Sequence, residues 1–104
     1  MSHTIVAQSQ PFGFPTFVQL SIQDYTQGGE VISITNDLQG KACKDFVFFP
    51  TLTNSLGVLL FGLWAPVNIF SGKIRLFQIT GGVASEIPTT AALNCNLSGL
   101  AQLT

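Results

Sequence analysis

The sequence predicts an all-β protein with a single domain, built either as an antiparallel β-sandwich or as a small β-barrel. Short apolar segments, rich in β-branched and aromatic residues, recur along the chain and are separated by glycine, proline and asparagine. No segment sustains the 3.6-residue period of an amphipathic helix. The length of 104 residues fits one β domain covering 1–104, large enough to bury a core of its own. These features are typical of sandwiches and small barrels.

The most apolar part of the chain is Asp45–Thr80, which holds six of the nine phenylalanines and the only tryptophan. Prolines and glycines divide it into segments too short for ordinary helices, so we expect a three-strand meander. Its strands are predicted at Cys43–Phe49, Val58–Trp64 and Ile74–Ile79. The first two are apolar on both faces, which indicates that both faces are covered. Gly62 is expected to mark a bulge or a close approach of two strands.

The N-terminal part is predicted to contain three further strands. Thr4–Gln8 is a short strand, and Gln10–Pro15 is irregular because its prolines favour extended geometry and its glycine permits a bend. Phe17–Gln23 alternates apolar and polar residues, as half-buried antiparallel strands do. Glu30–Thr35 alternates similarly, and the glycine-containing turn between these two strands predicts that they form a hairpin. Asn36–Lys41 is predicted as a turn.

Two strands are predicted near the C-terminus. Val83–Ile87 is expected to be a short edge strand that ends at Pro88, because proline cannot donate a backbone hydrogen bond. Ala91–Thr104 alternates leucine and cysteine with asparagine and serine, which predicts a last strand. A short helix starting at Thr89 or Thr90 is the alternative for this region.

Charged residues make up only 9% of the chain, and the formal net charge is −1. The charged fraction is far below the ~25% of ordinary soluble domains. A near-neutral chain is poorly protected against association, and a shortage of charge is typical of the buried centre of a protein interface. The composition therefore favours a protein that works within an assembly over an isolated globular protein. Four basic residues are too few for a nucleic-acid footprint, so no nucleic-acid partner is expected.

The sequence also argues against a membrane protein. The longest apolar run, Leu56–Val67, has about half the length needed to span a bilayer and is interrupted by glycine and proline. The N-terminal residues lack the basic and apolar segments of a secretory signal. We therefore expect no membrane contact and no secretory signal.

Few residues suited to catalysis are present. His3 is the only histidine and lies at a terminus expected to be mobile, so nucleophile–histidine pairs and metal sites lack a fixed imidazole. Asp24 and Glu30 could meet across the predicted hairpin as a glycosidase pair does, but a turn-capping aspartate and a solvated glutamate explain them better. We expect no enzyme activity, no cofactor and no metal. Cys43 and Cys95 are interpreted as half-buried thiols. A disulfide between them is the alternative, because the sequence does not show the geometry on which pairing depends.

Four short motifs, spread over Asp24–Leu93, resemble segments of a known family in the same order. They are Gly28-Gly29-Glu30, Asp45-Phe46-Val47, Ser71-Gly72-Lys73-Ile74-Arg75-Leu76-Phe77 and Glu86-Ile87-Pro88. The chain resembles the small virion proteins of tailed bacteriophages that are described as capsid decoration, or cement, proteins. It departs from their pattern in its low charge and at Pro66–Phe70, where a more polar turn is expected.

The resemblance implies a compact β-protein without enzyme activity, made in the host cytoplasm and carried on the surface of the virion. Such proteins bind the major capsid protein of the assembled shell, often as dimers or trimers. Two other hypotheses stay open: a ligand-binding module similar to a small lectin, using Tyr25 and its neighbouring loops, and a component of the phage tail or fibre base.

Partner contacts are expected where apolar residues lie in loops and terminal segments. Residues 1–16 are a candidate docking arm and Leu97–Thr104 a candidate docking tail, with ordinary edge strands of the domain as the alternative for both. Phe12 and Phe14 tuck either under the core or into a neighbouring subunit, and Tyr25 is the aromatic residue expected to be exposed. The candidate contact residues are Ile5, Phe12, Phe14, Tyr25, Pro66, Phe70, Leu100 and Leu103.

Overall fold

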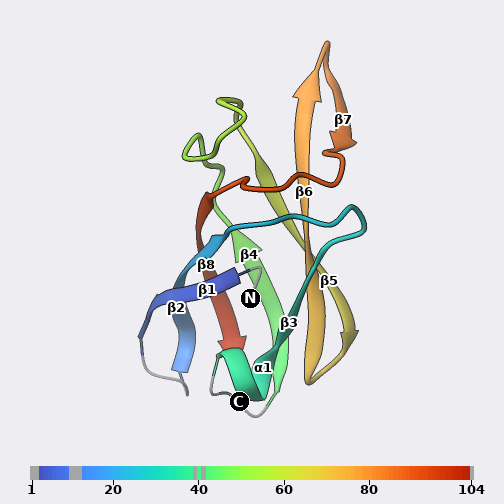
Figure 1. Cartoon of the computed structure of the whole chain (residues 1–104). Coiled ribbons are helices and arrows are strands. Elements are labelled where there is room, and N and C mark those ends of the chain that lie inside the picture. Colours follow the sequence, from blue (N-terminus) through green and yellow to red (C-terminus); the bar gives the residue numbers. More distant parts are fainter. Residues whose placement is uncertain (1–2, 10–12, 39, 41, 104) are drawn as a thin grey trace.

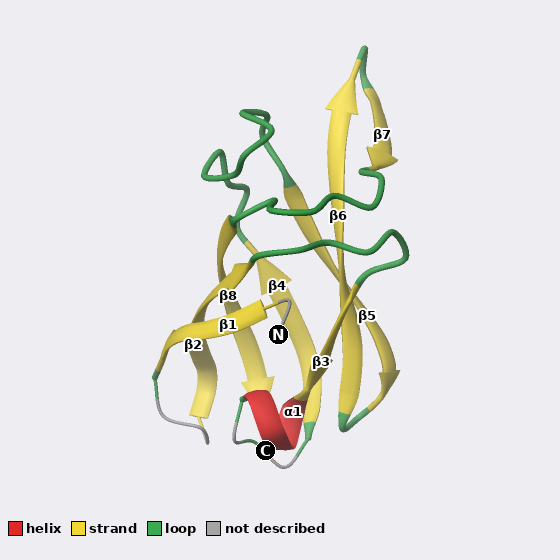
Figure 2. Cartoon of the chain, in the orientation of Figure 1, coloured by secondary structure: helices red, strands yellow, loops and turns green. Residues whose placement is uncertain are grey.

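The alternating segments of the sequence form an antiparallel sheet that curls upon itself (Figures 1 and 2). The computed structural model describes residues 3–9, 13–38, 40 and 42–103, and these contain eight strands and one helical turn. The strands are β1 (His3–Gln8), β2 (Gly13–Ile22), β3 (Glu30–Ser33), β4 (Cys43–Phe48), β5 (Phe61–Asn68), β6 (Ser71–Thr80), β7 (Val83–Glu86) and β8 (Cys95–Leu103), and helix α1 is Ile34–Asp37. The predicted all-β class is confirmed.

The strands follow the order β1-β2-β8-β4-β5-β6-β3, and β7 pairs with the other half of the long strand β6. The curl brings the two ends of this order, β1 and β3, towards each other. Side chains bridge them: His3 on β1 contacts Glu30 on β3, and the Gln8 amide donates to the Leu38 carbonyl just beyond α1. The structure is therefore a barrel and not a sandwich. The barrel is nearly closed, and polar side chains join β1 to β3 along the line where its edges meet, which we call the seam.

The predicted meander is present, because β4, β5 and β6 are neighbours in the sheet. Its second strand is displaced, however: β5 begins at Phe61 and continues through Pro66 to Asn68. A proline fits there because β4 pairs with β5 only at Val47–Leu63, so the far half of β5 has β6 as its one strand neighbour among the described residues. Proline is tolerated on such a free edge.

In one part of the interior, aromatic rings lie over glycines of neighbouring strands. The rings of Phe46 and Phe48 stack with their centroids 4.3 Å apart, and Trp64 lies 5.4 Å from Phe46. A side chain at Gly72 would collide with the Trp64 indole, and one at Gly62 would come within 3.0 Å of Phe48. Gly62 is thus a close-approach point, as predicted, and the missing side chains make room for the rings.

The predicted hairpin of Phe17–Gln23 with Glu30–Thr35 is wrong. The first strand, β2, pairs with β1 and β8, whereas the second, β3, pairs with β6. The segment between them crosses the open end of the barrel before it turns into β3 (Figure 1), because Tyr25 forms a bridge with Thr90 and is buried. The predicted glycine turn is present, with a hydrogen bond from the Gly29 N–H to the Thr26 carbonyl and positive φ at Gly28 and Gly29, but it leads β3 to β6 and not back to β2.

Three smaller predictions also changed. The end of Glu30–Thr35 and the start of the predicted turn form α1, where the Ser33 hydroxyl accepts from the Asn36 N–H and the Asp37 carboxylate accepts from the Ser33 N–H. This reciprocal capping stabilises a helical turn. Gly13–Pro15, predicted as irregular, belong to β2, and residues 10–12 lie outside the described residues. The region of Thr89 and Thr90 forms no helix, and β7 and β8 confirm the two C-terminal strands.

The contact between Gly72 and Trp64 gives a test of the packing. We predict that Gly72→Ala destabilises the protein by about 1–3 kcal/mol, because the added methyl forces the indole out of place. Urea unfolding measures the change. In a Trp64→Leu background, where the ring is gone, the same substitution should cost much less. An equal cost in both backgrounds would show that this contact does not govern the packing.

Candidate functional site

The carboxylates that were weighed as a catalytic pair have separate structural roles. Asp24 is exposed and accepts a hydrogen bond from the Ala92 N–H at 2.8 Å, as a turn-capping aspartate does. Glu30 is buried, so its prediction as a solvated residue is wrong. Within the described part of the chain, no three His, Cys, Asp or Glu residues gather in a way that could hold a metal ion.

His3 lies in β1, not on a mobile terminus as predicted, and it joins the seam of the barrel. Its Nδ1 lies 2.5 Å from Glu30 Oε2 on β3, and its Nε2 lies 3.2 Å from Asp37 Oδ1 on α1. The two ring nitrogens thus face carboxylates on two different elements. The cluster therefore ties β1 to the β3–α1 corner, and this geometry explains it without a catalytic role.

The expectation that Tyr25 is exposed is wrong: only 1% of it is accessible. Its hydroxyl donates to Glu86 Oε2 at 2.5 Å and accepts from the Leu76 N–H at 3.0 Å. Burial, reinforced by the Glu86 carboxylate, raises the pKa of Tyr25 far above its usual value. Tyr25 is thus a neutral hydrogen-bonding anchor of the core.

Glu86 is the other half of this anchor. Its carboxylate also accepts from the Gly28 N–H at 2.7 Å and from Arg75 Nη2 at 3.1 Å. Burial alone would raise the pKa of Glu86, but the hydrogen bonds from Arg75, Tyr25 and Gly28 outweigh it and lower the pKa below its usual value. The ionised Glu86 fastens the loop before β3 to strands β6 and β7.

The two cysteines are free thiols, and they are buried instead of half-buried as predicted. Burial raises the pKa of both Cys43 and Cys95 to about 11. Because the thiolate is the reactive form, both sulfurs are inert near neutral pH.

The feature that stands out is the outward surface of the meander. Val47 on β4 lies opposite Leu100 on β8 and Leu63 on β5, and Phe61 on β5 lies opposite Phe77 on β6. Within the single chain, β4 and β5 are not covered on both faces: Val47 and Leu63 are each more than half exposed. We call this surface the outer face; its members are Val47, Phe49, Phe61, Leu63, Phe77, Ile79 and Leu100.

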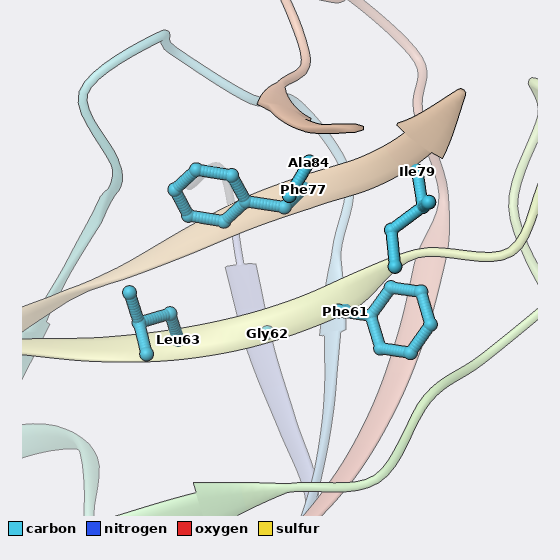
Figure 3. Close-up of a pocket in the computed structure, with 6 residues that line it drawn as sticks. All are labelled: Phe61, Gly62, Leu63, Phe77, Ile79 and Ala84. Atoms are coloured by element: carbon cyan, nitrogen blue, oxygen red, sulfur yellow. The ribbon is translucent and has the colours of Figure 1, made fainter. Parts of the chain in front are cut away.

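The outer face is hollowed where β5, β6 and β7 meet (Figure 3). A groove of about 320 Å³ is lined by apolar residues alone. In Figure 3, Phe61 and Ile79 lie at one end of the groove and Leu63 and Phe77 at the other. Gly62, between Phe61 and Leu63, also lines the groove. Such a groove can receive the apolar side chains of another protein but offers no polar group to a small substrate.

The charge on the outer face is neutralised within the chain. Arg75, directly opposite Leu63, is the basic residue in its middle, and its guanidinium is bound to Glu86. The guanidinium carbon also lies 5.1 Å from the centre of the Phe77 ring, a cation–π distance. The outer face therefore presents apolar surface and no unpaired charge at its centre.

A second apolar surface lies at the β5–β6 turn, at the opposite end of β6 from the β6–β7 hairpin (Figure 1). Its backbone is held in place: the Ile34 N–H donates to the Phe70 carbonyl at 2.8 Å, and the Cys43 N–H donates to the Ile69 carbonyl at 2.7 Å. The Asn68 side chain accepts from the Phe70 N–H. This rigid turn exposes four apolar residues, which we call the apolar tip: Pro66, Val67, Ile69 and Phe70.

The candidate contact residues predicted from the sequence differ in their exposure and position in the structure. Pro66 and Phe70 are exposed together in the apolar tip, Leu100 is partly exposed on the outer face, and Ile5 is packed against the core. Leu103, like Tyr25, is buried, so neither is a surface residue. Phe12 and the side chain of Phe14 lie outside the described residues.

Both candidate docking segments belong to the sheet. The described part of 1–16 forms β1 and the start of β2, and the described part of the candidate tail belongs to β8, which lies between β2 and β4. The outer-face residues Val47 and Leu63 were missed, although the signal was present in strands that are apolar on both faces.

A scan against protein-family models found no matching family, and searches of curated proteins and of solved structures found no match. In the described residues, none of the helical structure is long and apolar enough to cross a membrane.

The Tyr25 anchor can be tested by removing one oxygen atom. We predict that Tyr25→Phe destabilises the protein by about 1–3 kcal/mol, because the Leu76 N–H loses its acceptor inside the core and Glu86 loses a donor. Urea unfolding measures the loss. Ser85→Ala, a change at an exposed neighbour on β7, should stay within ~0.5 kcal/mol of the original protein. A Tyr25→Phe protein as stable as that control would contradict the assignment.

The thiols give an independent check of burial. In the native protein at neutral pH, a thiol-specific dye should react with Cys43 and Cys95 far more slowly than with a free thiol. In urea both should react at once. Fast reaction of the native protein would show that these sites are open, and a failure to react in urea would indicate a disulfide.

Proposed function

We propose that this protein is a non-enzymatic structural protein of a virion, of the capsid-decoration type, which binds the outside of a phage shell and reinforces it. The observation that carries the proposal is the rigid apolar tip formed by Pro66, Val67, Ile69 and Phe70. Exposed apolar clusters on an ordered backbone are typical of protein-binding sites. The four motifs that resemble decoration proteins supply the class of partner, which is the major capsid protein.

The physical chemistry of a shell suits a small binder of this kind. A protein that binds only the assembled form stabilises it by mass action, and each copy adds buried area between shell subunits. Many copies act together, so one contact needs only a modest interface. An ordered β-barrel with a pre-formed apolar tip loses little conformational entropy when it binds. Such a protein would be made in the host cytoplasm and work on the capsid surface.

The two alternatives stand differently. The lectin-like hypothesis relied on an exposed Tyr25, and the burial of that residue removes its platform for a sugar. A tail or fibre-base component could use the same apolar tip, so imaging of particles with a labelled chain has to separate it from a shell protein. If the protein decorates the shell, the images should show the labelled chain over the whole capsid surface.

The test begins with particles of the phage that encodes the chain. Mass spectrometry should find the protein in purified particles, and particles that lack it should lose their integrity at lower temperature. Phe70→Asp should abolish attachment of the purified protein to such bare particles, because it buries a charge in the contact. Val83→Asp changes an equally exposed residue in β7 and should leave attachment intact. Absence of the chain from purified particles, or full attachment of the Phe70→Asp protein, would refute the proposal.

A further inference from the structure

We propose that the outer face is covered by a second copy of this chain, in a two-fold symmetric dimer in which the two sheets pack face to face along β5. This inference goes beyond binding to a shell. It concerns a different surface from the apolar tip and does not require a shell to be present.

The exposed apolar area of the outer face is large enough for a protein interface. Seven large apolar side chains form the outer face, and four of them, Val47, Phe49, Leu63 and Ile79, are each about half exposed. With roughly 150–250 Å² available per large side chain, the outer face offers on the order of 500 Å² of apolar surface. Together with its polar border, this approaches the ~800 Å² that each partner contributes to a standard interface. A patch of this size marks an interaction surface.

The charge at the centre of the outer face also permits contact with a second copy. A two-fold contact brings each surface against itself, so an unpaired charge at its centre would meet a like charge. The outer face avoids this, because its one central cation, Arg75, is already bound to Glu86 and lies over the Phe77 ring. The face is therefore compatible with its own copy.

The border of the outer face supplies the complementarity. Asp45 lies two residues before Val47 on β4, and Lys73 lies two residues before Arg75 on β6, so each is on the same face of its strand as that residue. Lys73 lies opposite Ala65 on β5, and Val47 is the β4 residue that pairs with Leu63. A base on β6 and an acid on β4 thus lie on the two sides of β5. In the described residues, neither has an ion-pair partner within the chain.

A two-fold axis along β5 uses this arrangement. It stacks β5 on β5 of the second copy and β4 on β6 of the second copy. Leu63 then faces its own counterpart, and Asp45 of each copy faces Lys73 of the other, which gives two ion pairs at the border. Stacked sheets lie ~10 Å apart, a gap that a lysine and an aspartate can bridge together.

The test uses the isolated full chain in sedimentation equilibrium. The protein should be a dimer at high concentration and dissociate on dilution. Leu63→Asp should give a monomer, because two carboxylates meet on the axis in an apolar contact. Val6→Asp introduces the same charge at an exposed position on β1, away from the outer face, and should leave the dimer intact. Circular dichroism confirms that each variant is folded.

A charge exchange tests the geometry of the dimer. Asp45→Lys and Lys73→Asp should each weaken the dimer by about tenfold or more in Kd, because each brings like charges together twice. The double variant Asp45→Lys with Lys73→Asp restores opposite charges and should recover most of that affinity. Because both positions are partly or fully exposed in the single chain, the substitutions leave the core unchanged.

The outcomes separate this proposal from its alternatives. A chain that stays monomeric at millimolar concentration, or that forms trimers, would overturn it and leave the outer face to another protein. A dimer that survives Leu63→Asp would place the contact elsewhere. A double charge variant as weak as the single ones would refute the axis along β5. None of these results bears on attachment to particles through Phe70, so the two proposals can fail separately.

Discussion

The β4–β5–β6 meander is apolar on both faces, and the described residues bury only one of them. The inner face takes the rings of Phe46, Phe48 and Trp64, which lie over glycines on neighbouring strands. The outer face keeps Val47 and Leu63 in solvent. Apolar area on a folded monomer contributes nothing to its stability until something removes it from water. The meander therefore keeps apolar side chains that the described part of the chain leaves exposed.

The polar residues serve the barrel, and this explains why so few charges suffice. His3 contacts Glu30 and Asp37 across the seam of the barrel. Glu86 accepts hydrogen bonds from Tyr25, Arg75 and the Gly28 N–H. These groups make their contacts within the chain. Few charges are therefore left on the described surface, and a shortage of charge is typical of the centre of an interface.

Much of the fold could be predicted from the sequence, because alternation identifies strands such as Phe17–Gln23 and Ala91–Thr104 directly. Strand pairing could not, since the burial of Tyr25 carries the chain across the barrel where two glycines suggested a hairpin. The apolar tip was partly predictable, because Pro66 and Phe70 stand out in a turn. The outer face was predictable only in general terms: strands that are apolar on both sides indicate that both sides need cover, but not which side chains the single chain leaves exposed.

Hydroxyl-radical footprinting of the full chain, dilute and concentrated, tests most directly whether the outer face is a protein interface. Leu63 and Phe61 should be oxidised in dilute protein and protected in concentrated protein, whereas Val6 on β1 should be oxidised equally in both. If the oxidation of Leu63 does not change between the two conditions, the outer face is not covered by a second copy.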